Sequence, residues 1–388
     1  MKIVVFDTPE VRANLLPITY TRPVGDIRLG IDTMAERWQA FLPGEYTYRT
    51  APYLTELYPA PATVDSDTLW VAGNVVATAA LAEAVKALGE NEELRAGEIL
   101  VARRGDINSP AAATVIFDGE VDALTHVYDI FGLNGRVLEM DFRRITAGRS
   151  SIEPGEGTQI LGPREALFIE EGAAVDCATI NTRMGPVYIG RDATVMEGCH
   201  LRGPLAMCCN SVANMGCKIY GATTLGPWCK VGGELNNVVM LGFANKAHDG
   251  FLGNAVIGEW CNLGGGTVAS NLKNDYSEIK LWNYPAGRFL RTGLQFCGLI
   301  MGDHSKSAIN TSFNTATTVG VGCNIISEGM PRVFIPSFTK GGSSGFDNVN
   351  LNEFFAIEAR VMARRGRSLT EAHKRMFHAI AEYSDTFK

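Results

Sequence analysis

The most regular feature of the chain is a set of apolar residues that recur six positions apart between residues 169 and 263. This period is typical of a parallel β-helix, in which short strands meet at tight corners and apolar side chains stack along the interior. Three such repeats make one triangular coil. The residues in register are Ile169 and Val175, then Ile189, Val195 and Leu201, then Ile219, Leu225 and Val231, and finally Ile257 and Leu263.

The six-residue register fails twice, between Asn236 and Phe251 and between Lys273 and Gln295. In both places we expect an extra segment that loops out of the regular coil or crosses to a neighbour. Departures from a regular scaffold tend to carry function, so these two segments are the first places to search for a site. Beyond residue 302 the register is expected to resume at Ile309, Thr315 and Val321.

The two ends of the chain follow other patterns. Residues 2–6, 68–72 and 98–103 are predicted strands, and residues 79–88, which contain strong helix formers, a predicted helix. This alternation predicts an α/β domain with a Rossmann-like sheet covered by helices.

The tail is predicted to form two helices, because Asn350 with Glu353 and Ser368 with Glu371 fit capping boxes on either side of a glycine. We therefore predict an α/β domain at residues 1–150, a β-helix at residues 151–345 and C-terminal helices at residues 346–388.

Composition and charge narrow the class of protein. The formal net charge of -7 argues against nucleic acid as the main partner, since phosphate binding needs a concentrated basic surface. No apolar stretch approaches the roughly 18 residues of a membrane helix, and Asp7 ends the first apolar run too early for a secretion signal. We expect a cytoplasmic protein.

All nine cysteines lie between Cys177 and Cys323 without the paired spacing of a zinc site, so we interpret them as reduced packing residues.

One histidine, His248, stands in the first break of the register. Around it the chain reads Lys-Ala-His, Leu-Gly-Asn, Ile-Gly-Glu, Asn-Leu-Gly-Gly-Gly-Thr and Ser-Asn, with Gly-Gly-Glu before this segment and Asn-Leu-Lys-Asn and Gly-Asp-His after it. These motifs resemble the acetyltransferase half of the bacterial bifunctional family that unites glucosamine-1-phosphate acetyltransferase with N-acetylglucosamine-1-phosphate uridylyltransferase. The resemblance implies a left-handed parallel β-helix, a homotrimer with sites between subunits, acetyl-CoA as cosubstrate, and a sugar nucleotidyltransferase-like first domain.

The resemblance also implies roles for individual residues. His248 matches the general base, and Glu234 matches an acidic residue beside the sugar amine. Asn236 stands where the family commonly has lysine, and Phe251 where it commonly has tyrosine. The sugar phosphate would therefore need another cation, Lys246 or Lys273. The other carried-over assignments are a sugar contact by Asn262 and contacts to acetyl-CoA by Gly265, Asn271 and Asp303.

The chemistry itself needs few groups. An amine that attacks a thioester must lose a proton, and a neutral imidazole within reach speeds such a step by on the order of a hundred- to ten-thousandfold. Backbone N–H groups of the glycine-rich stretch 264–267 are candidate donors to the developing oxyanion.

The first domain lacks the glycine-rich phosphate loop of sugar nucleotidyltransferases. Arg12, Arg22 and Arg28 would have to neutralise the triphosphate, a task that suits the planar guanidinium fork. Asn74 stands where the family has a metal-binding aspartate, which leaves Asp129 as the candidate ligand of Mg²⁺. Nucleotidyl transfer from UTP or dTTP and loss of this activity are both compatible with the sequence.

Three other functions remain open. The first is an acyltransferase for another sugar with an inactive first domain, and the second is a noncatalytic trimeric scaffold. The third is a zinc enzyme that resembles the γ-class carbonic anhydrases and uses His200, His248 and His304. Separations of 48 and 56 residues argue against it, because that class needs two histidines close in sequence.

Overall fold

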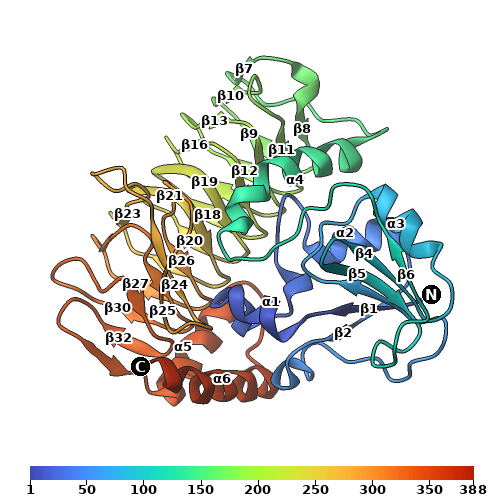
Figure 1. The fold of residues 1–388 in the computed structure, drawn as a ribbon. Coiled ribbons are helices and arrows are strands. Elements are labelled where there is room, and N and C mark those ends of the chain that lie inside the picture. The colour runs from blue at the N-terminus through green and yellow to red at the C-terminus, as the bar shows by residue number, and fades with distance from the viewer. The chain divides into compact units, whose positions relative to one another are not determined.

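The computed structural model describes residues 1–388, which fall into two compact units (Figure 1). The first unit comprises Met1–Arg28 and Asp32–His126, and the second Leu29–Ile31 and Val127–Lys388. None of the helices has both the length and the apolar character needed to span a membrane.

The first unit is built on a six-stranded mixed sheet with strand order β2-β1-β3-β5-β4-β6. The strands β1, β2 and β3 are mutually parallel, whereas β5 runs antiparallel to both β3 and β4. Parallel strands joined by helical segments agree with the α/β domain that the sequence predicts. The bounds are β1 Lys2–Phe6, β2 Glu45–Arg49, β3 Leu69–Ala72, β4 Glu92–Ala96, β5 Ile99–Arg104 and β6 Ala113–Ile116.

Two helices of this unit, α2 and α3, pack on the sheet through buried apolar side chains. Trp38 of α2 is fully buried and donates from Nε1 to the carbonyl of Ala72 at 3.2 Å. Each helix begins at a threonine N-cap, which satisfies a free backbone N–H of the first turn. The helices are α1 Pro9–Asn14, α2 Met34–Phe41 and α3 Ala79–Lys86, with 3₁₀ turns η1 Ile18–Tyr20, η2 Val24–Asp26 and η3 Pro52–Leu54.

The second unit is dominated by a parallel β-helix with three faces, which confirms the predicted fold class (Figure 1). Two long strands, β19 and β21, bend around a corner and take part in two faces. One face contains β7 Gln159–Leu161, β10 Thr179–Asn181, β13 His200–Arg202, β16 Lys218–Tyr220, β19 Glu234–Met240, β21 Phe251–Ile257, β23 Val268–Ala269 and β28 Ser312–Phe313.

The other two faces are equally continuous. The second contains β8 Leu167–Ile169, β11 Val187–Ile189, β14 Leu205–Met207, β17 Thr223–Leu225, the ends of β19 and β21, β26 Ile300–Met301, β29 Thr318–Val319 and β31 Phe334–Ile335. The third contains β9 Ala174–Val175, β12 Thr194–Val195, β15 Val212–Ala213, β18 Lys230–Val231, β20 Asn245–Lys246, β22 Asn262–Leu263, β27 Lys306–Ser307, β30 Asn324–Ile325, β32 Thr339–Gly341 and β33 Phe346–Asn348.

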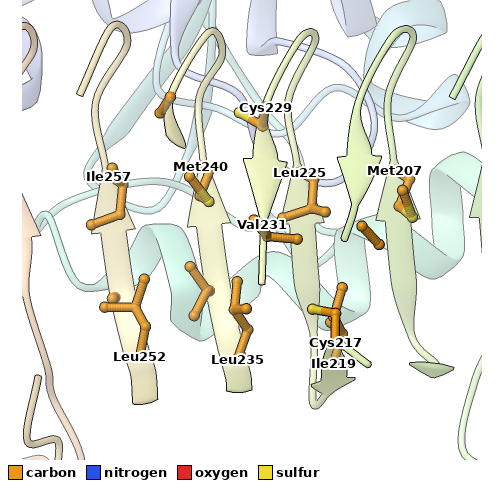
Figure 2. Packing of buried hydrophobic residues seen from close by; sticks show 14 of the residues in the cluster. Met207, Cys217, Ile219, Leu225, Cys229, Val231, Leu235, Met240, Leu252 and Ile257 are labelled. Atoms are coloured by element: carbon orange, nitrogen blue, oxygen red, sulfur yellow. The ribbon is translucent and has the colours of Figure 1, made fainter. Parts of the chain in front are cut away.

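The interior of the β-helix is a stack of apolar side chains in register from coil to coil (Figure 2). Ile219 of β16, for example, lies between Leu201 of the preceding coil and Leu235 of the following one. All ten residues that the six-residue period predicts between residues 169 and 263 belong to this core.

The register predicted for the last coils is wrong. Ile309 is 74% exposed, and the interior positions there are instead Ser307, Phe313, Val319 and Ile325. These residues are also six apart, so the period is right but its phase is displaced by two positions.

The two predicted breaks of the register have different causes. In the first, no segment loops out; the coil is shortened, since Leu225 pairs with Met240 and Val231 with Lys246 rather than with residues eighteen positions later. In the second, an extra segment does leave the coil, as predicted. It forms an antiparallel hairpin of β24 Lys280–Asn283 and β25 Arg288–Arg291.

One long helix, α4 Asp129–Thr146, packs on the second face of the β-helix. Its Leu138 and Phe142 contact Phe168, Tyr188 and Ala206. The short segment Leu29–Ile31 runs along the same surface. Gly30 N donates to Asn134 Oδ1 at 2.8 Å, and Thr224 Oγ1 donates to the Gly30 carbonyl at 2.8 Å.

The C-terminal helices are α5 Leu351–Ala363 and α6 Glu371–Ser384, flanked by the short turn η5 Asp385–Phe387; the other 3₁₀ turn of this unit is η4 Arg164–Ala166. Asn350 is the N-cap of α5, as predicted, and accepts from the N–H groups of Asn352 and Glu353. The predicted cap Ser368 is wrong, because Thr370 caps α6 with His373 in the N3 position.

Helix α5 packs on the corner of the last coils through a buried ionic cluster, and Phe377 of α6 packs edge-on against the His304 ring. The fully buried carboxylate of Glu358 in α5 accepts from His304 Nδ1 at 2.6 Å and contacts the ammonium of Lys306. Burial is the largest single influence on the pKa of Glu358 and raises it, but His304 and Lys306 together lower this pKa below its ordinary value.

Seven of the nine cysteines are buried and all nine are free thiols. Burial raises the pKa of the thiols of Cys217, Cys261, Cys297 and Cys323, so they pack as small apolar groups.

Candidate functional site at a corner of the β-helix

His248 lies on a corner of the β-helix, in the bend between β20 and β21, and it is exposed. Its neighbour on the next coil is Gly265, where an added Cβ would lie 3.6 Å from the His248 Cβ and 3.7 Å from two carbons of its ring. A side chain at position 265 would cover this flank of the imidazole. Glycine therefore leaves the ring accessible from the side of the following coil.

Backbone and side-chain hydrogen bonds from both adjacent coils fix this corner. From the preceding coil, Glu234 N donates to the Gly250 carbonyl at 3.1 Å, and from the coil before that, Asn214 Nδ2 donates to the Ala247 carbonyl at 2.8 Å. From the following coil, Gly266 N donates to the Asp249 carbonyl at 3.1 Å. The exposed imidazole thus stands on a backbone that is held on both sides.

Glu234 begins β19 on the coil before His248, where it pairs with Phe251. Its Oε1 accepts a hydrogen bond of 2.5 Å from the hydroxyl of Tyr220. This bond to a carboxylate raises the pKa of Tyr220 to about 12, so the tyrosine stays a neutral donor at physiological pH. Glu234 is half-buried and retains its second carboxylate oxygen for another partner.

A surface hollow of about 460 Å³ lies on the first face of the β-helix and includes Glu234. Three basic side chains line it, those of His200, Arg202 and Lys218, together with Tyr220. They project outward because each flanks an interior residue of its strand. No sequence motif singled out Arg202 and Lys218. The eighteen-residue coil contained the signal, since it places Lys218 beside His200.

The two lysines expected to hold the sugar phosphate are otherwise engaged. Lys246 is only 1% exposed, and its Nζ donates to the carbonyls of Gly232 at 3.1 Å and His248 at 2.8 Å. Lys273 donates to Ser277 Oγ at 3.3 Å and to the Glu278 carbonyl at 2.9 Å. Neither ammonium points into the hollow that Glu234 lines.

Of the other residues expected to contact sugar or acetyl-CoA, some lie near the His248 corner and others lie elsewhere on the β-helix. Phe251 and Gly265 adjoin the His248 corner, and Asn262 is exposed on β22, which leads to the corner of Gly265. Asn271 follows β23 and donates from Nδ2 to Asn254 Oδ1 at 2.8 Å. Asp303 is buried at another corner, before β27, where Oδ1 accepts from Glu259 N at 2.9 Å.

In the first unit, Arg12 is committed to internal hydrogen bonds. Its guanidinium donates to Asp7 Oδ2 at 3.1 Å, to Thr50 Oγ1 at 2.8 Å and to the Thr19 carbonyl at 2.6 Å. Arg22 is 3% exposed. These contacts use much of the donor capacity that a bound triphosphate would need.

Asp7 directly follows β1, at the carboxyl end of a parallel strand, where α/β sheets commonly present a ligand site. Its carboxylate accepts from Val24 N at 3.1 Å and Thr50 Oγ1 at 2.7 Å in addition to Arg12. Burial raises its pKa, and Arg12 counteracts that effect. Asp7 is therefore a second carboxylate to consider in this unit.

The remaining nucleotide-site candidates do not form one cluster within a single unit. Arg28 and Asn74 belong to the first unit, where Arg28 lies 3.7 Å from Glu36 and Asn74 donates to the Leu124 carbonyl at 3.1 Å. Asp129 belongs to the second unit and opens α4, a position where the helix dipole stabilises a carboxylate.

No group of three or more His, Cys, Asp or Glu side chains is arranged to hold a metal ion. A magnesium ion at the first unit would thus depend mainly on substrate phosphates and water, with one or two carboxylates at most. For the zinc hypothesis, His200 lines the hollow, His248 lies on the corner after β20, and His304 is bonded to Glu358. These three imidazoles do not converge within the chain.

Comparison with known proteins finds similarity to a nucleotidyl transferase family and to bifunctional proteins. Residues 3–150 match the sugar nucleotidyl transferase family. The bifunctional protein GlmU of Methanocaldococcus jannaschii is 36% identical over 76 residues, which cover 20% of this chain and 18% of that protein. The bifunctional sugar-1-phosphate nucleotidylyltransferase/acetyltransferase of Sulfurisphaera tokodaii is 27% identical over 138 residues, which cover 35% and 34%.

The chain therefore matches about a third or less of the length of these curated relatives. Among solved structures, the UDP-N-acetylglucosamine acyltransferase of Francisella novicida aligns with 10% identity and a TM-score of 0.30, over 59% of this chain and 77% of that one. The chain is thus similar to sugar nucleotidyl transferases over residues 3–150 and, over shorter stretches, to bifunctional nucleotidylyltransferase/acetyltransferase proteins, which agrees with the expected class of enzyme, a transferase.

Proposed function

We propose that the β-helix transfers the acetyl group of acetyl-CoA to the amine of glucosamine-1-phosphate, and that residues 1–150 transfer a nucleotidyl group from UTP or dTTP to a sugar-1-phosphate. The protein would act in the cytoplasm in nucleotide-sugar synthesis. The observation that carries the acetyl-transfer proposal is an exposed imidazole, that of His248, held on a fixed corner beside Gly265 and one coil away from Glu234.

In the proposed reaction the neutral amine nitrogen attacks the thioester carbon, so that a C–N bond forms and the carbonyl oxygen becomes an oxyanion; collapse of this tetrahedral intermediate then breaks the C–S bond. His248 accepts the proton that the nitrogen loses and returns it to the departing sulfur, which leaves as the free thiol of CoA. No covalent intermediate on the enzyme is required. Backbone N–H groups of the corner at Gly264–Thr267 are the candidate donors to the oxyanion.

The hollow beside Glu234 is the proposed acceptor site. Its basic side chains, Lys218, Arg202 and His200, supply the positive charge that a sugar phosphate needs and that the asparagine at position 236 does not. The carboxylate of Glu234 would accept a hydrogen bond from an N–H of the neutral sugar amine and orient the amine toward the corner. The acetyl-CoA contacts that we propose remain those of Gly265, Asn271 and Asp303.

A homotrimer is the proposed assembly. Met215 and Ile309 lie on other coils, at the same corner of the β-helix as His248. Both apolar side chains are largely exposed in the single chain, at 66% and 74%. Burial of such residues against another subunit would remove them from water and close the open side of the imidazole.

Nucleotidyl transfer has a specific competing interpretation. The guanidinium of Arg12 is occupied by Asp7 and Thr50, which favours a first domain that keeps its fold without binding a triphosphate. In the active alternative, Arg22 and Arg28 would hold phosphates, Asn74 would contact the nucleotide, and Asp129 would be a ligand of Mg²⁺, which would neutralise phosphate charge.

Two assays test the proposal. Purified protein is offered acetyl-CoA with glucosamine-1-phosphate, glucosamine, galactosamine-1-phosphate and a UDP-linked amino sugar, while free thiol release is followed. We expect turnover with glucosamine-1-phosphate and its loss in His248→Ala, whereas release that continues in His248→Ala would refute the assignment of the base. Pyrophosphate release from UTP or dTTP with Mg²⁺ and N-acetylglucosamine-1-phosphate decides separately between the two interpretations of the first domain.

A further inference from the structure

Lys246 occupies a position in the β-helix interior that the register otherwise assigns to small or apolar side chains. Its column runs through Val231 on the preceding coil and Leu263 on the following one. Lysine is almost never fully buried unless it is paired, because the ammonium loses its hydration. A lysine that is 1% exposed between a valine and a leucine therefore needs a local reason.

The reason lies in the backbone of the adjoining corner. The ammonium donates to the carbonyl of His248 at 2.8 Å and to the carbonyl of Gly232, on the preceding coil, at 3.1 Å. A third hydrogen bond joins the same residues, because Gly232 N donates to the Lys246 carbonyl at 2.8 Å. Lys246 thus ties the corner that carries the imidazole to the coil that carries Glu234.

The electrostatic surroundings agree with this geometry. Burial lowers the pKa of Lys246 to about 8, while the nearby Cys217 and Asp249 act in the opposite direction. The amino group accordingly remains mostly protonated at neutral pH and acts as a charged donor to both carbonyls. Hydrogen bonds from a charged donor are roughly twice as strong as neutral ones.

We propose that Lys246 is a positioning residue, which holds the corner of residues 247–250 from inside the β-helix and thereby orients the imidazole of His248. This role differs from the phosphate contact expected from the sequence, since the ammonium faces backbone carbonyls. The inference rests on the proposed acetyl transfer only in that His248 is taken as the base. The mechanical part, that the lysine fixes the corner, is independent of the reaction.

The test replaces Lys246 by methionine, which has a similar length and no donor. Leu263→Met is the matched control, since it changes the next residue of the same interior column without removing a polar contact. Circular dichroism and sedimentation first establish that both variants fold and assemble as the wild type does. Hydrogen–deuterium exchange measured by mass spectrometry then compares the peptide that covers residues 243–252 with peptides from the distant coils.

We expect faster exchange in this peptide in Lys246→Met and no change in Leu263→Met. In acetyl transfer we expect kcat to fall at least tenfold in Lys246→Met, with KM for both substrates within about threefold of the wild type. A general loosening of the fold would instead change exchange in other coils and raise KM.

Unchanged exchange at residues 243–252 in folded Lys246→Met would overturn the proposal, whatever the activity. Faster exchange with an unaltered kcat would overturn the link to His248. If the wild type transfers no acetyl group to any acceptor, the proposed function fails, and the exchange result alone then decides whether Lys246 holds the corner. A variant that does not fold is replaced by Lys246→Leu, which matches the aliphatic residues of the column, and the same criteria apply.

Discussion

The buried ammonium of Lys246 predicts a dependence of stability on pH that can be calculated from the structure. Its pKa is about 8 in the folded protein and 10.5 in ordinary surroundings, a difference of 2.5 pH units. Below pH 8 both states hold the proton. Between pH 8 and 10.5 the unfolded chain still holds a proton that the folded protein has released, so the folded state gains stability as the pH rises.

The full gain is at most about 3 kcal/mol, at about 1.4 kcal/mol for each unit of pKa, and water near the corner reduces it. At pH 7 almost none of the gain is present, whereas at pH 9 about 1.4 kcal/mol has been reached by the same linkage relation. In Lys246→Met there is no ammonium to lose, so this contribution is absent at every pH. The free energy of unfolding of the wild type should therefore rise, relative to that of the variant, by about 1 kcal/mol between pH 7 and pH 9.

Urea unfolding of both proteins at the two pH values, followed by circular dichroism, measures this difference. Buried thiols and tyrosines also titrate in alkaline solution, but they are common to both proteins and cancel in the comparison. Leu263→Met again provides the control and should parallel the wild type. If the gap between wild type and Lys246→Met is the same at pH 7 and pH 9, the ammonium is not buried as the structure indicates, and the reasoning is wrong.

Three further predictions address the rest of the second unit. Glu358→Gln should lower the free energy of unfolding by about 3 kcal/mol, because it removes the anionic partner of a buried cluster; urea denaturation measures this loss, and exposed Glu382→Gln should change little. Ile219→Ala should cost about 3 kcal/mol in the same assay, since it opens a cavity between two coils, and a cost below 1 kcal/mol would contradict the interior register. A thiol reagent applied to the native protein should label Cys177 first, since it is the exposed cysteine, and mass spectrometry should find Cys261 unmodified until the protein unfolds.

The period of apolar residues was sufficient to predict most of the β-helix but not the phase of its last coils. Two sets of residues in that region are six apart, one with Ile309 and one with Phe313 and Val319, and both satisfy the pattern. The hairpin after Lys273 interrupts the count between them. Only the pairing of β22 with β27 fixes the phase, because it aligns Leu263 with Ser307 and leaves Ile309 outside.

The candidate site was predictable in part for a related reason. His248 lies in a distinctive local motif, so sequence alone could single it out. The cations of the hollow, such as Arg202 and Lys218, come from different coils, and their proximity depends on the stacking of strands rather than on any motif. The burial of Lys246 was not predictable from residue type, because lysine chemistry favours the surface, whereas the register of its column places it inside.

The burial of Lys246 also bears on how the corner works. Each local rule for a β-helix favours an aliphatic side chain at position 246, and the buried ammonium costs the folded protein up to about 3 kcal/mol at neutral pH. A position that departs from the consistent pattern at such a cost is where a function is to be expected. Here the departure and the exposed His248 adjoin the same corner, and the lysine bonds the histidine's own carbonyl. The destabilising charge and the proposed base are therefore parts of one arrangement, in which stability at neutral pH is lower and the imidazole is held in place.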